Sequence, residues 1–255
     1  MKKEEYAWMA SLEGHFWWYR GMRSIIQSFF MPFYNGKPGV LLDAGCGTGY
    51  TLTWMANWLT VTLPIGMDIS PEAFRWRVRP FFCPVLANIT HFPFRPGSID
   101  ILGSFDVLYT LPTLHEVATA LQNMHDALAP GGLLLLRVPA FPFLYGAHDK
   151  AVGGCRRFRR QPLCRQVETS GLEVLRAGYI NTFLFPLAAL KRLFHRYLRD
   201  TDSSEVRPVP DWLDSFLYAF LALEALLLRW RWLRFPFGLS LLLIARKPTP
   251  IPASK

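Results

Sequence analysis

The chain has 255 residues, long enough for one large domain or for a domain with an appendage. Its formal charge is +9, and 51% of its residues are apolar, including nine tryptophans and twenty phenylalanines. This composition argues against nucleic acid and favours an anionic membrane as the partner of the positive charge. The four cysteines lack metal-ligand spacing and the charged start is unlike a signal peptide, so we expect a reduced, cytoplasmic protein without a bound metal.

The first predicted element is an aromatic segment near the N-terminus. Residues 14–23 read Gly-His-Phe-Trp-Trp-Tyr-Arg-Gly-Met-Arg, and a helix is predicted from Gly21 to Phe30. So many aromatic side chains must be buried against another part of the chain, because their contact with water is unfavourable. We therefore assign residues 1–36 to an N-terminal helical cap.

The most specific motif follows a short apolar strand, within residues 40–49, Val-Leu-Leu-Asp-Ala-Gly-Cys-Gly-Thr-Gly. Asp43 ends the strand, and three glycines at alternate positions let the backbone turn sharply and approach a ligand closely. A helix predicted directly after the turn would direct its free N–H groups at that ligand. A turn of this kind holds a nucleotide-like cofactor at the carboxyl end of the first strand of a parallel sheet.

The next two predicted strands continue an alternating strand–helix order. Residues 61–69 form a strand that ends near Asp68, one helix and one strand after the glycines. An acidic residue at this position can accept hydrogen bonds from both hydroxyls of a ribose. A shorter strand at 84–88 leads into a turn at 88–94.

Two further strands and a helix complete the central part of the chain. A strand at 99–104 leads into Phe105, and apolar residues recur at helical spacing over His115–Leu128. The helix stops at Pro130-Gly131-Gly132. The continuous apolar run Leu133–Val138 that follows is typical of a strand covered on both faces.

The order and spacing of these motifs resemble class I S-adenosylmethionine (SAM)-dependent methyltransferases. Asp-x-Gly-x-Gly-x-Gly resembles their first motif, Asp68 stands at their ribose-binding position, and L-x-P-G-G-x-L-L-L at 128–136 is a further signature. Asn88 stands where the family commonly has an adenine-contacting aspartate; its amide oxygen can also accept from an amine. The resemblance implies SAM as the cofactor, held by Asp43, Gly45, Cys46, Gly47, Gly49, Asp68, Ile69, Asn88, Ile89 and Phe105.

The aromatic segment resembles the E-x-x-H-F-W-W-x-x-x-R opening of prokaryotic methyltransferases linked with glycan and lipid metabolism. The resemblance implies that the segment packs over the cofactor pocket. Arg23 and Tyr19 would then reach the carboxylate of SAM through charge-assisted hydrogen bonds. The alternative is a helix that only covers the edge of the sheet.

The loop after the fifth predicted strand, residues 139–165, resembles the family element H-D-x-x-x-G-H-x-R-R-Y, with Cys155 where histidine is usual. The resemblance implies that this loop lies over the acceptor. His148 is a candidate general base, and Asp149 would orient it or bind an acceptor hydroxyl. The candidate acceptor-binding residues are Tyr145, Arg156 and Arg157. Arginines here suit a phosphate or anionic lipid head groups, or form a solvated loop.

An apolar insertion at 183–237 separates the sixth strand, predicted at 173–179, from the last strand. It holds two predicted helices, joined by a hinge at 200–210, and a segment rich in tryptophan and arginine. The apolar runs are too short to span a bilayer, so the helices either lie in the interface of an anionic membrane or pack on the sheet or a homodimer partner. The remaining assignments are 37–182 for the SAM-binding core, 238–247 for the last strand and 248–255 for a disordered tail.

The sequence thus predicts an α/β protein with a Rossmann-like, mostly parallel seven-stranded sheet, helices on both faces, an N-terminal helical cap and a helical insertion before the last strand. The predicted function is SAM-dependent transfer of a methyl group to a lipid-linked or glycan-type acceptor at the inner face of a membrane. Two alternatives stay open. One is a soluble small-molecule methyltransferase with a hydrophobic acceptor pocket, and the other is a non-catalytic interaction protein of the same fold.

Overall fold

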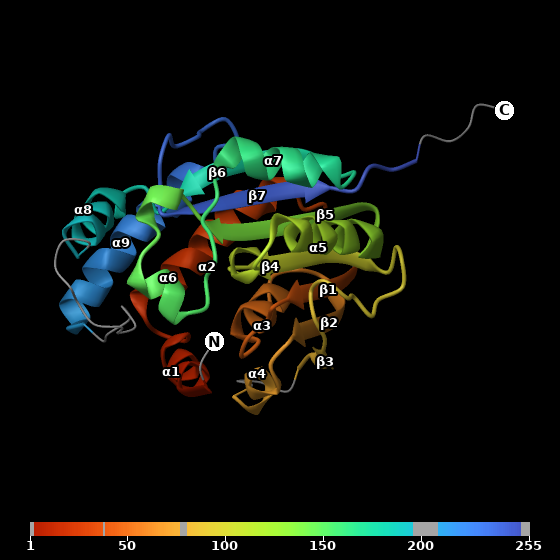
Figure 1. The fold of residues 1–255 in the computed structure, drawn as a ribbon, viewed down its shortest axis with the longest axis horizontal. Helices are drawn as coiled ribbons and strands as arrows, with labels where there is room; N and C mark the ends of the chain where they lie inside the picture. Colours follow the sequence, from red (N-terminus) through yellow and green to blue (C-terminus); the bar gives the residue numbers. More distant parts are fainter. Residues whose placement is uncertain (1–2, 38, 77–80, 196–208, 251–255) are drawn as a thin grey trace.

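The protein is described from a computed structural model that covers residues 3–37, 39–76, 81–195 and 209–250. Within this part of the chain, seven strands form one sheet in the order β3-β2-β1-β4-β5-β7-β6 (Figure 1). The strands are β1 (Gly39–Ala44), β2 (Val61–Asp68), β3 (Cys83–Leu86), β4 (Ile99–Phe105), β5 (Leu128–Pro139), β6 (Glu173–Ile180) and β7 (Ser240–Arg246).

Only β7 runs against its neighbours within this sheet. It is antiparallel to both β5 and β6, whereas the other neighbouring pairs are parallel. The carboxyl ends of β1–β6 therefore meet at one edge of the sheet. These observations confirm the predicted Rossmann-like, mostly parallel seven-stranded sheet.

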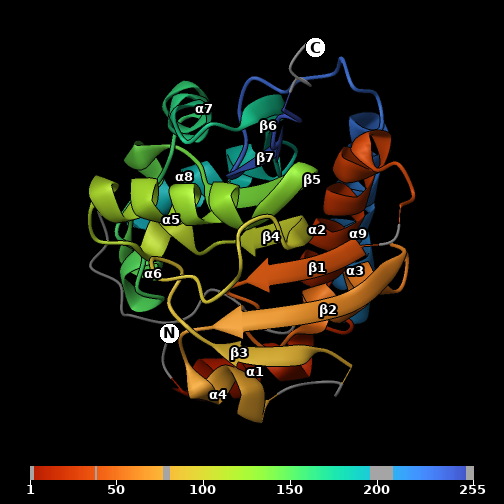
Figure 2. The same cartoon turned by 90° about the vertical axis from the view of Figure 1, so that its right-hand side faces the viewer.

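Helices cover both faces of the sheet, with α5 and α7 on one face and α2, α3 and α9 on the other (Figure 2). Short 3-10 turns lie at Met31–Phe33, Leu108–Thr110 and Pro142–Leu144. The helices are α1 (Lys3–Leu12), α2 (Trp17–Phe30), α3 (Tyr50–Ala56), α4 (Pro71–Arg75), α5 (Leu114–Ala127), α6 (Ala147–Ala151), α7 (Arg160–Thr169), α8 (Phe185–His195) and α9 (Asp211–Leu228).

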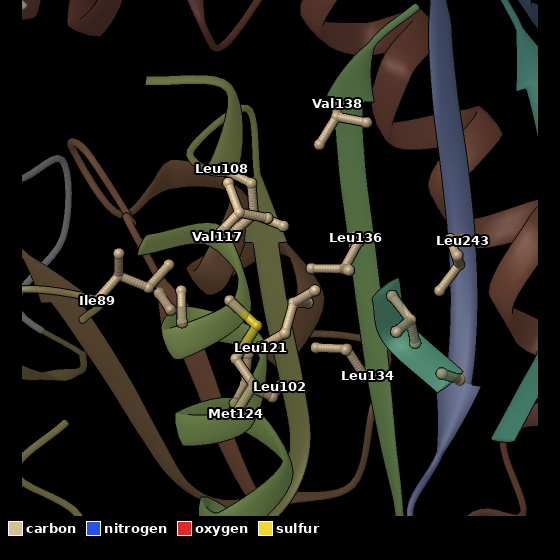
Figure 3. Close-up of a cluster of buried hydrophobic side chains, with 14 of the residues drawn as sticks. Ile89, Leu102, Leu108, Val117, Leu121, Met124, Leu134, Leu136, Val138 and Leu243 are labelled. Carbon is tan, nitrogen blue, oxygen red and sulfur yellow. The ribbon is translucent and has the colours of Figure 1, made fainter. Parts of the chain in front are cut away.

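The α5 face forms one compact apolar cluster (Figure 3). Apolar side chains of α5 recur at helical spacing and pack on β4 and β5, for example Leu121 and Met124 beside Leu102. A capping box fixes the start of the helix, because Thr113 accepts from the Glu116 N–H at 3.1 Å while Glu116 accepts from the Thr113 N–H at 2.8 Å. This packing positions the carboxyl end of β4 at the candidate site.

The opposite face is built from α2 and α9, which lie directly on each other. A Cβ at Gly21 of α2 would lie 2.2 Å from Leu221 of α9, so this contact requires glycine. Asp214 of α9 accepts from the Trp17 N–H at 2.8 Å, at the start of α2, and pairs with Arg20 at 3.3 Å. Helix α2 therefore begins earlier than predicted and is a core helix.

Helix α9 lies in the predicted apolar insertion and has one buried face. Glu224 on this face is fully buried and accepts hydrogen bonds from the N–H groups of Asn181 at 2.6 Å and Thr182 at 2.8 Å, just after β6. The insertion therefore packs on the protein's own core through this face, while the outer face of α9 is exposed. In the described ranges, no helix combines the length and apolar character needed to cross a bilayer.

Two sequence assignments fall largely outside the described residues. Most of the predicted hinge at 200–210 lies in the range 196–208, and residues 251–255 belong to the predicted tail. The chain between β7 and residue 250 has no regular secondary structure.

Candidate functional site

The glycine turn after β1 has a backbone that only glycine tolerates without strain. Gly45, Gly47 and Gly49 have φ values of 93°, 55° and 77°. A Cβ at Gly45 would lie 2.1 Å from Val107, and one at Gly49 would lie 2.2 Å from Phe82. The N–H groups at positions 45 and 46 both donate to the carbonyl of Met67, at 2.7 and 2.9 Å, which joins the ends of β1 and β2.

Asp68 lies beside this turn at the carboxyl end of β2. Its Oδ2 accepts from the Gly47 N–H and its Oδ1 accepts from the Ser70 N–H, both at 2.9 Å. Ile69, the next residue, is exposed, with 67% of its surface accessible. The carboxylate is thus held in a fixed position where a ligand on the turn would meet it.

Asn88 and Ile89 follow β3 at the same edge of the sheet. The Asn88 Oδ1 accepts from the Thr90 N–H at 3.0 Å and so shapes this turn. Ile89 is buried in the α5 cluster, and its carbonyl accepts from the Asn123 side chain at 3.3 Å. These contacts fix the turn where the sequence places the adenine contact.

Asp43 is buried at the end of β1, and its Oδ1 lacks a hydrogen-bond partner in the described part of the chain. The pKa of Asp43 is raised to about 7, chiefly by burial and also by the nearby Asp68 and Glu13 carboxylates, while Arg137 opposes the rise. The interior of the turn is therefore acidic, and it holds a carboxylate oxygen that can accept from a ligand.

Helix α1 covers the glycine turn. The sequence predicted an N-terminal cap, but not which residues of it contact the turn. The Thr48 hydroxyl of the turn donates to the carboxylate of Glu13, just beyond α1. The methyl carbon of Met9 lies 2.9 Å from where a Cβ of Gly47 would be. Burial and the neighbouring Asp68 carboxylate raise the pKa of Tyr6 to about 12. Glu13 stands just before the aromatic run that begins at Phe16, and this position was the only hint in the sequence of its contact with the turn.

The two candidate carboxylate ligands on α2 occupy different positions. Arg23 is buried beside the turn, where it donates to the Glu13 carbonyl at 2.7 Å and lies 4.6 Å above the Tyr50 ring. Tyr19 is half-buried and packs against Phe16, with 6.4 Å between ring centroids. Arg23 is therefore the better placed of the two.

Helix α6 carries His148 and Asp149 and lies beyond the carboxyl ends of the strands (Figures 1 and 2). The Nδ1 atom of His148 is buried and has no hydrogen-bond partner among the described residues. The Asp149 carboxylate has other partners. The Arg157 Nε donates to its two oxygens at 3.0 and 3.1 Å, and the Gly146 N–H donates to it at 2.9 Å.

The pairing of Asp149 with Arg157 gives both side chains a structural role. Both side chains are almost fully buried, and Arg157 also donates to the Ala140 carbonyl at 3.2 Å. A buried ion pair of this kind holds the loop in place. The predicted roles of Asp149 beside His148 and of Arg157 toward an acceptor stay predictions.

The other predicted acceptor residues also support the loop. The Tyr145 hydroxyl donates to the Gly154 carbonyl at 2.9 Å. Arg156 donates to the Pro112 carbonyl, and Cys155 is exposed. These residues and the glycine turn lie at the same edge of the sheet, beyond the carboxyl ends of the parallel strands. The hydrogen bonds of Tyr145 and Arg156 are to backbone carbonyls of neighbouring loops.

Phe105 ends β4, and the next residue, Asp106, was not among the predicted site residues. Arg137 of β5 pairs with Asp106 at 2.6 Å and lies 5.7 Å from the Phe105 ring centroid. Asp106 has a φ of 56°, and its buried Oδ1 has no partner in the described ranges. A residue with a positive φ and an unpartnered buried oxygen is a candidate functional residue. Neither feature of Asp106 can be recognised from the sequence.

A family model described as a methyltransferase domain matches residues 16–177, more than half of the chain. The chain belongs to this methyltransferase family. A relative from Dechloromonas aromatica (strain RCB), malonyl-[acyl-carrier protein] O-methyltransferase, is 32% identical over 99 residues. That match spans 39% of this chain and 36% of the relative.

Several solved structures share the fold at low sequence identity. A putative methyltransferase in complex with the Haloferax volcanii Trm112 activator is 19% identical with a TM-score of 0.59, covering 96% of both chains. The [4+2]-cyclase SpnF is 16% identical with a TM-score of 0.59, covering 91% of this chain and 82% of that one. Phosphoethanolamine N-methyltransferase 2 of Haemonchus contortus, in complex with SAM, is 14% identical with a TM-score of 0.58, covering 91% and 53%.

The family match and the fold support SAM as the cofactor of this methyltransferase, and the residues fit it. The glycines leave room for close approach, Asp68 suits a ribose, and the buried Asp43 oxygen lacks a partner within the described ranges. Carboxylates surround the turn, and SAM carries a positive sulfonium centre. When bound, SAM supplies a methyl group activated by its positively charged sulfur.

The affinity for SAM is expected to rise about three- to tenfold between pH 6 and pH 8. The pKa of Asp43 is raised to about 7, so this carboxyl is mostly protonated at pH 6 and mostly ionised at pH 8. A cationic ligand stabilises the ionised form, and binding near pH 7 should therefore release protons. Calorimetry in two buffers of different ionisation enthalpy measures this release, and Asp43→Asn should reduce it. Equal affinity at both pH values without proton release would contradict the expectation.

Proposed function

We propose that this methyltransferase transfers a methyl group from SAM to a lipid-linked or glycan-type acceptor at an anionic membrane surface. The observation that carries the proposal is an exposed apolar surface on the insertion. We call it the α9 outer surface, and it comprises Trp212, Phe216, Phe220, Leu223, Leu226, Trp230 and Trp232, which are 37% to 75% exposed. A soluble surface seldom carries so many exposed aromatic residues together.

The position and charge of this surface support the proposal. Arg229, Arg231 and Arg234 are exposed beside the tryptophans at the end of α9, where arginine and tryptophan suit lipid head groups. Helix α8, with exposed Leu187 and Leu190, starts at the carboxyl end of β6. This is the edge of the sheet that holds the glycine turn (Figure 1), and the start of α9 lies at the same end, where Asp214 accepts from the Trp17 N–H, so a membrane docked on α8 and the start of α9 would lie near the cofactor site.

The proposal assigns proton removal to His148. For a hydroxyl acceptor, SAM when bound would supply the methyl group, and His148 would accept the hydroxyl proton at Nδ1. This nitrogen has no other partner in the described residues. The other contribution of the chain is alignment, because held reactants avoid the entropy cost of meeting.

Membrane docking is tested by flotation with phosphatidylglycerol vesicles. The wild-type chain should float with these vesicles and not with neutral phosphatidylcholine ones. The double variant Leu223→Glu/Leu226→Glu places two charges on the α9 outer surface and should lose most of the floating protein. Leu114→Glu is the matched control, because Leu114 is 60% exposed on α5 and lies outside that surface. Flotation unaffected by the double variant, or a concentration-dependent dimer that the variant disrupts, would contradict membrane docking.

The acceptor class is tested with SAM carrying a labelled methyl group and a total membrane lipid extract from the source cells. Label should enter the lipid-soluble fraction, and His148→Ala should lower its rate by about 100-fold or more while SAM affinity is unchanged. Label in the aqueous fraction would instead support a small-molecule acceptor. Binding of SAM without any labelled product would support the non-catalytic alternative.

A second candidate acceptor rests on the partial match to a malonyl-[acyl-carrier protein] O-methyltransferase. The acceptor would then be a carboxyl group on a carrier-bound acyl chain. The exposed apolar surface and the charge of +9 also fit an acidic carrier with an apolar cargo. With malonyl-acyl-carrier protein supplied in place of the lipid extract, label in the protein-bound fraction would favour this candidate.

A further inference from the structure

Glu13 lies at the junction between α1 and α2, and its carboxylate faces the glycine turn. The residue is 6% exposed, and it accepts the hydroxyl of Thr48, which lies between Gly47 and Gly49. Within the described residues, no cation forms an ion pair with this carboxylate. A buried carboxylate without an ion pair is unfavourable, and burial accordingly raises the pKa of Glu13 to about 7.

Arg23 lies next to Glu13 and its charge lowers the Glu13 pKa, but the two side chains form no ion pair among the described residues. Its guanidinium donates to the backbone carbonyl of Glu13 at 2.7 Å and stacks on Tyr50, the first residue of α3. A guanidinium has five N–H donors in a planar fork, so this one bond leaves several for a ligand carboxylate. The junction thus presents a cation and an anion side by side at the end of the turn.

We propose that Glu13 binds the ammonium group at the amino-acid end of SAM, beside Arg23, which the family resemblance already assigns to the SAM carboxylate. The inference rests on SAM being the cofactor and adds a residue that the sequence motifs did not identify. The amino-acid end carries one positive and one negative group, which matches the pair. Charge-assisted hydrogen bonds in a buried site are strong enough to decide affinity.

The test compares SAM with 5′-methylthioadenosine, which keeps the adenosine and the sulfur but lacks the amino-acid end. Isothermal calorimetry should show that Glu13→Gln weakens SAM binding by about 10- to 100-fold. The same variant should change binding of 5′-methylthioadenosine by less than about threefold. Thermal unfolding of the variant checks that the fold is intact.

Glu168→Gln is the matched control, because it makes the same change at an exposed carboxylate on α7, away from the turn. This variant should retain the preference of the wild type for SAM over 5′-methylthioadenosine. An equal loss of both ligands in Glu13→Gln would make Glu13 a structural residue and overturn the inference, as would no loss of either. A wild type that binds neither ligand would overturn the choice of cofactor itself, and a wild type that binds both equally would overturn the inference alone.

Discussion

Asp68→Ala is expected to weaken SAM binding by about 100-fold or more, because two charge-assisted hydrogen bonds to the ribose would be lost. The side chain is already held by the N–H groups of Gly47 and Ser70, so it meets a ligand in a fixed orientation. Asp68→Asn should lie between the wild type and Asp68→Ala, since the amide keeps one acceptor oxygen. Isothermal calorimetry with SAM measures all three affinities.

Glu168→Ala is the control for this series. Glu168 is an exposed carboxylate on α7, remote from the turn, and its loss should leave SAM binding unchanged. A reduction in affinity that is equal in Asp68→Ala and Glu168→Ala would reflect overall charge. Unchanged affinity in Asp68→Ala would remove the ribose assignment.

Glu224→Gln is expected to lower the free energy of unfolding by about 2–4 kcal/mol. The carboxylate is fully buried and accepts three backbone N–H groups, from Asn181, Thr182 and Phe183, at 2.6, 2.8 and 3.4 Å. A glutamine would present its amide N–H₂ to some of these donors and leave them unsatisfied. Urea denaturation measures the loss. Glu168→Gln is the control, with an expected change within about 0.5 kcal/mol.

The pH dependence of the free energy of unfolding provides a second test of the role of Glu224. Burial raises the pKa of Glu224 from 4.5 to about 7, although the backbone donors oppose this shift. Between these values the folded state binds more protons than the unfolded state, so this carboxyl contributes less stability as the pH rises from about 4.5 to 7. Glu224→Gln should therefore flatten the pH dependence of unfolding in this window. A variant with the wild-type slope would show that Glu224 stays ionised.

The sheet and the glycine turn could be predicted because their signals are local. The apolar strands, Asp43 at the end of one strand and the alternating glycines each determine the local backbone conformation of their own segment. The predicted ends of strands were less accurate where pairing with a distant part of the chain extends the strand. Strand β5 begins at Leu128, not at the predicted Leu133, because the Gly131 N–H donates to the carbonyl of Lys247 at 2.8 Å and the Lys247 N–H donates back to Gly132 at 3.0 Å.

The roles of charged side chains were harder to predict, since each depends on which partner the fold brings near. Asp149 and Arg157 both occupy motif positions, yet they neutralise each other. Helix α1 covers the turn and brings Glu13 to it, and an unusual φ after β4 places Asp106 there. The apolar pattern of α9 was also ambiguous, because one face packs on α2 while the other stays exposed.

A crystal structure with SAM or its demethylated product tests the central claim most directly. The account predicts electron density on the turn formed by Gly45, Gly47 and Gly49, with the ribose hydroxyls at Asp68 and the amino-acid end beside Arg23. A ligand bound elsewhere, with α1 still packed on the turn, would contradict it.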